Sequence, residues 1–315
     1  MKVLVTGGAG FIASHVVDGY IALDHEVVVV DDLSRGSERN LNPKARFYKV
    51  DVRDAKGLGA VFAAEKPEVV NHHAAQMDVR RGVREPGFDA DVNILGSINL
   101  LGLAVEYHVK RIIYVSTAGA AYGEPKHLPV PEDAPINPIT PYGISKHTVE
   151  HYLFTYNCLY GLSYVVLRYG NVYGPRQSSQ GEAGVFAIFA EQMLAGEQPV
   201  IYGDGSKTRD YVYISDVVAA NVAALELGTG EIFNIGAGVP TRDDEIFRLV
   251  CAQLGKAELQ PRYVAVRPGE IEHITLDTSK AKWLLRWEPA INIAEGARLT
   301  VEYFQKHARQ NVVTA

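Results

Sequence analysis

The 315-residue chain has little cysteine, no clustered basic charge and no long apolar run. Two cysteines can form at most one disulfide, too few to stabilise a chain of this length. The count excludes a disulfide-rich secreted scaffold and favours a reducing compartment. The formal net charge is -6 with scattered basic residues, so no broad positive field exists for a nucleic-acid backbone or an anionic membrane. No apolar run approaches the ~18 residues of a membrane span, and the first strand pattern begins too near Met1 for a signal peptide. We predict a cytoplasmic protein without nucleic-acid or membrane partners.

Short β-branched segments alternate with amphipathic segments through the first half of the chain. The predicted strands are Lys2–Val5, Glu26–Val30, Arg46–Val50, Glu68–Asn71, Arg111–Val115 and Tyr164–Arg168. Several of them are apolar at successive positions, as expected when helices cover both faces of a sheet. The alternation predicts the α/β class with a doubly wound parallel (Rossmann) sheet.

Beyond residue 173 the alternation loosens into a polar loop (174–184), a helix (Val185–Leu194) and a turn-rich tail. We expect a smaller C-terminal substrate domain here. Because Ile232–Ile235 has the pattern of one more buried strand, the two domains are expected to be interleaved. The predicted division gives the dinucleotide-binding domain residues 1–173, rejoined by about 208–236, and the substrate domain residues 174–207 and 237–315.

A glycine-rich turn, Thr6–Ala13, follows the first strand and precedes a helical pattern. Glycines there allow a tight turn and let a pyrophosphate approach the backbone at the N-terminus of the helix. Asp31 ends the second strand about 20 residues later, the spacing at which a carboxylate accepts hydrogen bonds from the adenosine ribose. Asp31 and Asp32 would repel a 2′-phosphate, so NAD is expected rather than NADP, although Arg35 is of the type that binds that phosphate.

Tyr142 and Lys146 are four residues apart on a predicted helix (142–160), so their side chains share a face. A lysine ammonium favours the phenolate and lowers the pKa of a neighbouring tyrosine, which makes a general base. Ser116 and Thr117 follow the fifth strand, at the sheet edge where doubly wound folds bind ligands, and a hydroxyl there can relay the proton. Each feature alone also has a structural explanation, as surface packing or as a turn cap.

Together with further segments, these motifs resemble the extended short-chain dehydrogenase/reductase family, in its NAD-dependent nucleotide-sugar epimerase branch, along nearly the whole chain. The matching segments are Thr6–Ala13, Asp31-Asp32, His72–Gln76, Asn93, Ser116-Thr117, Ala121–Gly123, Tyr142–Lys146, Arg168–Arg176, Arg209–Tyr211 and Arg267–Glu270. The resemblance implies hydride transfer from carbon 4 of the sugar to NAD, rotation of the 4-keto sugar and return of the hydride to its other face. In this scheme Tyr142 takes the proton of the 4-hydroxyl, Lys146 tunes Tyr142 and binds the nicotinamide ribose, and Thr117, or as second choice Ser116, supplies the partner hydroxyl.

The resemblance also implies the binding residues. Expected cofactor contacts are Gly7, Gly10, Phe11, Ile12, Asp31, Asp32, Ser34, Gly36, Asp51, Val52, His73, Ala74, Ala75, Gln76, Asn93, Ser116, Tyr142, Lys146 and Tyr169. Expected nucleotide-sugar contacts are Thr117, Tyr142, Asn171, Val200, Tyr202, Arg209, Arg267 and Glu270. Three structural alternatives remain open: Asp51 as a helix cap, Tyr169 as a core aromatic, and the two arginines in surface ion pairs. No metal is expected, because the adjacent His72 and His73 point to opposite faces of a strand without an acid cluster.

Residues around the predicted site narrow the reaction. Ala118 and Gly119 follow Thr117, where dehydratases of this family carry an acid, so epimerisation without elimination is expected. Ile274 stands where some relatives have a bulky aromatic, which is compatible with UDP-glucose and UDP-galactose as substrates. UDP-glucuronate and UDP-N-acetylglucosamine are alternatives, and a non-catalytic NAD-sensing protein is the alternative of another class.

Two predicted helices, 93–107 and 142–160, carry apolar residues around more of their circumference than one sheet face can cover. Helices of similar enzymes pair in a homodimer, and the resemblance implies the same here. Burial of these residues by the second domain is the alternative.

Overall fold

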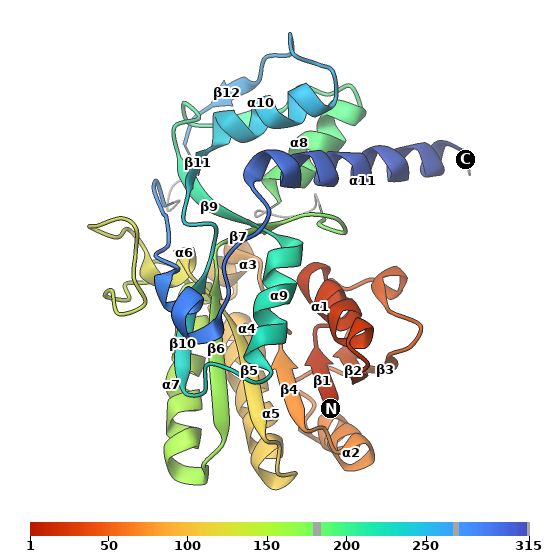
Figure 1. Cartoon of the computed structure of the whole chain (residues 1–315), viewed down its shortest axis with the longest axis vertical. Coiled ribbons are helices and arrows are strands. Elements are labelled where there is room, and N and C mark those ends of the chain that lie inside the picture. The colour runs from red at the N-terminus through yellow and green to blue at the C-terminus, as the bar shows by residue number, and fades with distance from the viewer. Residues whose placement is uncertain (179–183, 267–270, 314–315) are drawn as a thin grey trace.

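A parallel seven-stranded sheet forms the lower half of the molecule in Figure 1. The structure is a computed structural model and describes residues 1–178, 184–266 and 271–313. Across the sheet the strands are β10 (Glu231–Ile235), β6 (Ser163–Tyr169), β5 (Arg111–Thr117), β4 (Val69–His72), β1 (Lys2–Thr6), β2 (Glu26–Asp31) and β3 (Arg46–Lys49). The strand order reverses between β1 and β4, which is the switch point where doubly wound folds bind their ligands. The predicted fold class is confirmed.

Helices cover both faces of this sheet. On one face lie α1 (Phe11–Ala22) and α9 (Ile214–Ala224), which pack against each other. The opposite face is covered by α2 (Ala55–Glu65), α5 (Gly96–Glu106) and α7 (Pro141–Tyr160). Successive strand residues enter different cores, so that Val3 and Val5 pack with α1 while Leu4 packs with α2. This double burial explains the continuous apolar runs of the strands.

The helix across the middle of the second face is longer than predicted. It runs from α4 (Pro86–Ala90) through a π-helical turn, η2 (Asp91–Leu95), into α5, whereas the sequence pattern placed its start at residue 93. By length and composition this 21-residue segment could cross a membrane, with a mean hydropathy of 1.3, contrary to the expectation that no run of that kind exists. Leu100, Leu101 and Ala104 of this segment lie in the core beneath the sheet, and 39% of its apolar window is buried inside the protein.

A second set of elements lies beyond the carboxyl edge of the sheet. It contains a three-stranded sheet of β7 (Asn171–Tyr173), β9 (Thr208–Tyr213) and β11 (Pro240–Arg242), and a pair of β8 (Val200–Tyr202) with β12 (Arg262–Val264). Its helices α8 (Val185–Leu194), α10 (Asp243–Gln253) and α11 (Ile293–Val313) lie together at the top of Figure 1. The short elements α3 (Val79–Arg84), α6 (Gly119–Tyr122), η1 (Glu38–Asn40) and η3 (Ala281–Leu285) complete the described chain.

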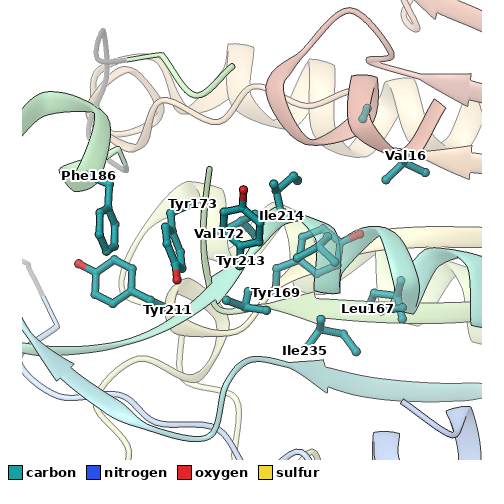
Figure 2. Packing of buried hydrophobic residues seen from close by; sticks show 14 of the residues in the cluster. Val16, Leu167, Tyr169, Val172, Tyr173, Phe186, Tyr211, Tyr213, Ile214 and Ile235 are labelled. Carbon is teal, nitrogen blue, oxygen red and sulfur yellow. The ribbon is translucent and has the colours of Figure 1, made fainter. Parts of the chain in front are cut away.

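The two parts share one continuous core. Figure 2 shows the rings of Tyr173, Phe186 and Tyr211 gathered at one end and the sheet residues Leu167 and Ile235 at the other. Tyr173 and Phe186 are stacked with their ring centroids 4.3 Å apart. After the second set of elements has begun, the chain returns to the large sheet as β10, which pairs in parallel with β6. The elements are thus interleaved along the sequence, while the division into two domains stays a prediction.

Candidate active site

The glycine-rich turn after β1 lies directly against the loop that follows β4. Gly7 has a φ of +71°, and a Cβ atom there would lie 2.8 Å from the backbone nitrogen of Ala74. Gly10 is the N-cap of α1, and Phe11 and Ile12 begin that helix. The turn therefore brings the positive end of α1 to the sheet edge with its backbone uncovered by side chains, which fits a bound pyrophosphate.

Asp31, at the end of β2, is 7% exposed and organises this turn. Its carboxylate accepts hydrogen bonds from the backbone nitrogens of Ala9 (3.0 Å) and Leu33 (2.8 Å), while burial raises its pKa. Arg35, the residue that complicated the choice of cofactor, instead pairs with Asp78 at 2.8 Å. With its arginine neighbour engaged elsewhere, Asp31 suits the ribose diol of NAD rather than a 2′-phosphate.

The neighbouring predicted cofactor residues are also held in place. Asp32 accepts hydrogen bonds from both the backbone nitrogen (2.9 Å) and the hydroxyl (2.6 Å) of Ser34. A Cβ atom on Gly36 would lie 2.8 Å from an oxygen of Asp31. These contacts give the loop after β2 a fixed shape around the Asp31 carboxylate.

Asp51 is not the cap of α2. That cap is Asp54, whose side chain accepts a hydrogen bond from the Gly57 nitrogen at 2.9 Å. Asp51 instead binds the guanidinium and backbone nitrogen of Arg53, which lowers the pKa of the Asp51 carboxyl. Val52 is buried against Gly96 of α5. The structure thus removes the capping alternative, and a contact of Asp51 and Val52 with adenine stays a prediction.

The first turns of α7 carry Tyr142 and Lys146. Thr140 caps the helix by accepting a hydrogen bond from the Gly143 nitrogen at 3.2 Å, and Pro141 occupies the first helical position. Lys146 is only 3% exposed, with its Nζ 4.3 Å from the centroid of the Tyr114 ring. We find no hydrogen bond from this ammonium to any described residue, so its donors suit a ligand such as the nicotinamide ribose.

The prediction that the Tyr142 pKa is lowered is wrong for the protein without a bound ligand. Burial, and then the charge of Asp89, raise the pKa of Tyr142 to about 12. Burial lowers the pKa of Lys146 to about 7, partly opposed by Glu150 and Asp89. Desolvation disfavours the charged form of each group and is the largest cause of both shifts. The sequence spacing contained no information on this burial.

The structure distinguishes the two candidate hydroxyls on β5. Ser116 is buried and donates a hydrogen bond to Glu150 at 2.6 Å, and Glu150 also binds the guanidinium of Arg168 at 2.6 Å. Thr117 is half-buried, and we find no hydrogen bond from its hydroxyl to any described residue. Thr117 is therefore the hydroxyl available to a ligand, while Ser116 supports the buried Glu150–Arg168 pair, which sequence reasoning missed.

The loop after β4 is fixed by Asn93. Its side chain accepts a hydrogen bond from the Gln76 nitrogen at 2.8 Å and donates one to the Gln76 carbonyl at 3.0 Å. His72 bridges the hydroxyls of Thr6 (2.7 Å) and Ser97 (2.9 Å). Asn93 and His72 thereby set the path of the predicted cofactor residues His73, Ala74, Ala75 and Gln76 along the sheet edge.

His72, the last residue of β4, and His73, which follows it, are both neutral. Burial lowers the pKa of His73 to about 3 and that of His72 well below its ordinary value. Tyr169 is buried beside His73, with ring centroids 6.4 Å apart, and its hydroxyl accepts a hydrogen bond from Asn221 at 2.6 Å. Tyr169 is thus a core aromatic, as the structural alternative had it, and a nicotinamide contact stays a prediction. Across residues 1–178, 184–266 and 271–313, no group of three or more potential metal ligands occurs.

The predicted nucleotide-sugar residues lie on the strands beyond the sheet edge. Asn171 opens β7 beside Tyr211, and Val200 and Tyr202 are half-buried on β8. On β9, Arg209 donates hydrogen bonds to the carbonyl oxygens of Thr208 (2.9 Å) and Glu272 (3.2 Å) rather than forming a surface ion pair within the described chain. A small cavity beside it is lined by Gly203, Asp204, Ser206, Lys207, Val266, Glu272 and His273.

Two of the predicted nucleotide-sugar residues, Arg267 and Glu270, lie outside the described residues. Ile274 is buried in a small cluster with Ala118 and Tyr122. Its side chain is therefore packed within the protein, and it carries less information on the size of the sugar pocket than its sequence position implied.

Comparison with known proteins identifies close similarity over the whole chain. Residues 3–236 match the model of the NAD dependent epimerase/dehydratase family. The chain is 42% identical to the UDP-glucose 4-epimerase of Mycolicibacterium smegmatis, with 98% of this chain and 100% of that protein covered. It resembles the crystal structure of the Thermotoga maritima UDP-glucose 4-epimerase with UDP-glucose at 50% identity and a TM-score of 0.96, covering 98% of this chain and 100% of the other. The Thermus thermophilus UDP-glucose 4-epimerase, solved in complex with NAD, gives 42% identity, 97% and 99% coverage and a TM-score of 0.91.

Proposed function

The chain belongs to the NAD dependent epimerase/dehydratase family, and on this premise we propose that it interconverts UDP-glucose and UDP-galactose by transient oxidation at carbon 4. The main support is that three features meet at one sheet edge: the glycine-rich turn, the buried Lys146 ammonium and the Thr117 hydroxyl. We find no hydrogen-bond partner for this ammonium or this hydroxyl among the described residues. Similar chains are named for this reaction.

In the proposed mechanism the chain's own residues handle the proton. Tyr142 accepts the proton of the sugar 4-hydroxyl and later returns it, while Thr117 holds the same hydroxyl in place. Lys146 supplies the positive charge that favours the Tyr142 phenolate. Bound NAD would supply the hydride acceptor and donor for carbon 4, and its positive charge would oppose the effect of burial, which raises the pKa of Tyr142 to about 12.

Epimerisation fits the site better than elimination. The residue after Thr117 is Ala118, which is fully buried and whose nitrogen donates a hydrogen bond to the Tyr169 carbonyl at 2.9 Å. No carboxylate stands at that position to move a proton at carbon 5. Hydride removal and return then remain as the chemistry for Tyr142 and Lys146.

For the nucleotide end we propose contacts from six residues. Arg209 and Arg267 bind the diphosphate, because planar guanidinium groups match phosphate oxygens. Asn171 hydrogen-bonds a phosphate or the sugar, and Glu270 binds the ribose. Val200 and Tyr202 border the base from β8.

The test is conversion of UDP-galactose to UDP-glucose by purified protein, followed beside a panel containing UDP-glucuronate and UDP-N-acetylglucosamine. We expect Tyr142→Phe to lower kcat by about 10²- to 10⁴-fold while NAD remains bound. Tyr303→Phe, a half-buried tyrosine on α11, is the matched control and should turn over normally. Near-normal turnover by Tyr142→Phe would refute the mechanism, and preference for another sugar would change the substrate.

We also propose a cytoplasmic homodimer that pairs α5 and α7 with their copies. Large apolar side chains are exposed on α7 and just before α5: Ile144 (51%), Phe154 (60%) and Leu159 (67%) on α7, and Leu95 (54%) at the end of η2. The second set of elements leaves these residues uncovered in the monomer. Sedimentation should give a dimer at micromolar concentration, and Phe154→Asp should shift it towards monomer; a monomeric parent protein would contradict the proposal.

A further inference from the structure

Asp89 on α4 is a buried carboxylate that the proposed mechanism does not use. It is 1% exposed, and we find no ion pair between it and a described residue. Its oxygens accept hydrogen bonds from the Ser145 hydroxyl (2.7 Å) and the Gln76 side-chain nitrogen (3.0 Å). Burying a charge without an opposite charge is costly, so its presence beside the predicted site needs a reason.

The hydrogen bonds of Asp89 reach the catalytic helix between its two key residues. Ser145 lies on α7 between Tyr142 and Lys146, and its hydroxyl also contacts the Tyr142 carbonyl at 3.0 Å and accepts a hydrogen bond from Asn93 at 3.1 Å. On the far side, a Cβ atom at Gly82 would lie 2.9 Å from an Asp89 oxygen, so α3 leaves room for the carboxylate. Asp89 thus joins α4 to the second turn of α7.

The charge of Asp89 acts on both proposed catalytic residues. It raises the pKa of Tyr142 and the pKa of Lys146. The other titratable groups around Lys146 are Tyr142 and Glu150 of α7, Tyr114 of β5, and His72 and His73 at the end of β4. The histidines and Tyr114 are neutral because of burial, and Glu150 is paired with Arg168 at 2.6 Å. Asp89 is therefore the negative charge near Lys146 that no cation neutralises within the described chain.

We propose that Asp89 is a positioning residue for the catalytic helix, which holds Ser145 and supplies a buried negative charge to the Lys146 ammonium. The inference rests on the roles proposed for Tyr142 and Lys146. Asp89 favours the charged lysine at the expense of the tyrosine phenolate, so it sets the pH range in which both are in their working forms.

The test compares the pH dependence of kcat for the NAD-loaded protein and its Asp89→Asn variant. Removing the charge should displace both limbs of the bell-shaped profile to lower pH by about one unit. The variant should then be up to about tenfold faster than the parent below the acid limb and up to about tenfold slower above the alkaline limb. Glu85→Gln, which removes an exposed acid from the same segment, is the matched control and should leave the limbs in place.

Ser145→Ala tests the positioning role of Asp89 separately from the effect of its charge. It keeps Asp89 but breaks its link to α7, so kcat should fall about tenfold without displacement of either limb. If kcat of Asp89→Asn falls equally at every pH, or if Ser145→Ala turns over like the parent protein, the proposal is overturned. If Asp89→Asn does not fold, Ser145→Ala decides. Persistent activity of Tyr142→Phe would instead count against the proposed function itself.

Discussion

Replacing Lys146 with methionine should make the protein more stable at mildly acidic pH while inactivating it. Lys146 is buried and no hydrogen bond links its ammonium to the described chain, so the protein accepts an unfavourable buried charge there. Methionine has a similar length and keeps an apolar chain over the Tyr114 ring. The substitution therefore removes the charge with little loss of packing.

The magnitude follows from the pKa. A folded pKa of about 7 against an ordinary 10.5 for Lys146 corresponds to about 5 kcal/mol of unfavourable free energy, at ~1.4 kcal/mol per unit. Below pH 7 we thus expect Lys146→Met to raise the free energy of unfolding by up to about 5 kcal/mol.

The sign of the pH dependence follows from proton binding. Between pH 7 and 10.5 the unfolded chain keeps the Lys146 proton and the folded protein has lost it, so the parent protein gains stability as the pH rises. The advantage of Lys146→Met should therefore be full at pH 6 and decline by up to ~1.4 kcal/mol per unit above pH 7.

Urea unfolding at pH 6, 7, 8 and 9 measures this difference, with Lys56→Met as control. Lys56 is exposed on α2, so its substitution should change stability by less than ~0.5 kcal/mol at every pH. Epimerisation by Lys146→Met should fall by about 10²-fold or more. A variant less stable than the parent at pH 6, or a difference that does not change with pH, would refute the argument.

Three further substitutions test other parts of the structure. Glu150→Ala leaves Arg168 buried and unpaired, so it should destabilise by about 3–5 kcal/mol in urea unfolding; a loss below ~1 kcal/mol would show that the pair is dispensable. Gly123→Ala puts a Cβ atom 2.2 Å from the Asn137 carbonyl at a φ of +68°, and its thermal midpoint should fall by several degrees; an unchanged midpoint would contradict this. Asp31→Asn should weaken NAD binding about tenfold or more, measured by calorimetry, and unchanged affinity would exclude the ribose contact.

Most of the fold could be predicted because its signals are local. Continuous β-branched runs placed the strands of the large sheet within two residues, and the return of β10 followed from one buried run. The start of the helix at Pro86 was missed, because Asp89, Asp91 and Asn93 interrupt the apolar pattern. In the folded protein Asp89 and Asn93 are buried and bonded to partners elsewhere in the chain, which a linear pattern does not show.

The site, like the fold, was predictable where its signals are local in the sequence. Three parts of the site were recognisable as short motifs with a chemical reason for each residue: the turn containing Gly7, the acid Asp31, and the pair of Tyr142 and Lys146. Asp89 was not, because its bond to Ser145 joins segments 56 residues apart. The direction of the Tyr142 pKa also depends on burial, and burial is a property of the packed structure rather than of spacing.

The way buried charges are satisfied distinguishes Lys146 from the rest of the described protein. Glu150 and Arg168 form an ion pair, and the Asp210 carboxylate accepts three backbone hydrogen bonds, from Ala237, Gly238 and Leu276. These groups have their hydrogen-bond partners within the protein. Lys146 has an aromatic ring and two carboxylates, Glu150 and Asp89, with which we find no hydrogen bond, and its donors remain for a ligand. Because the Lys146 ammonium lacks such partners in the described chain, we infer that it is retained for binding and catalysis. Removing it is therefore expected to stabilise the fold and to abolish turnover.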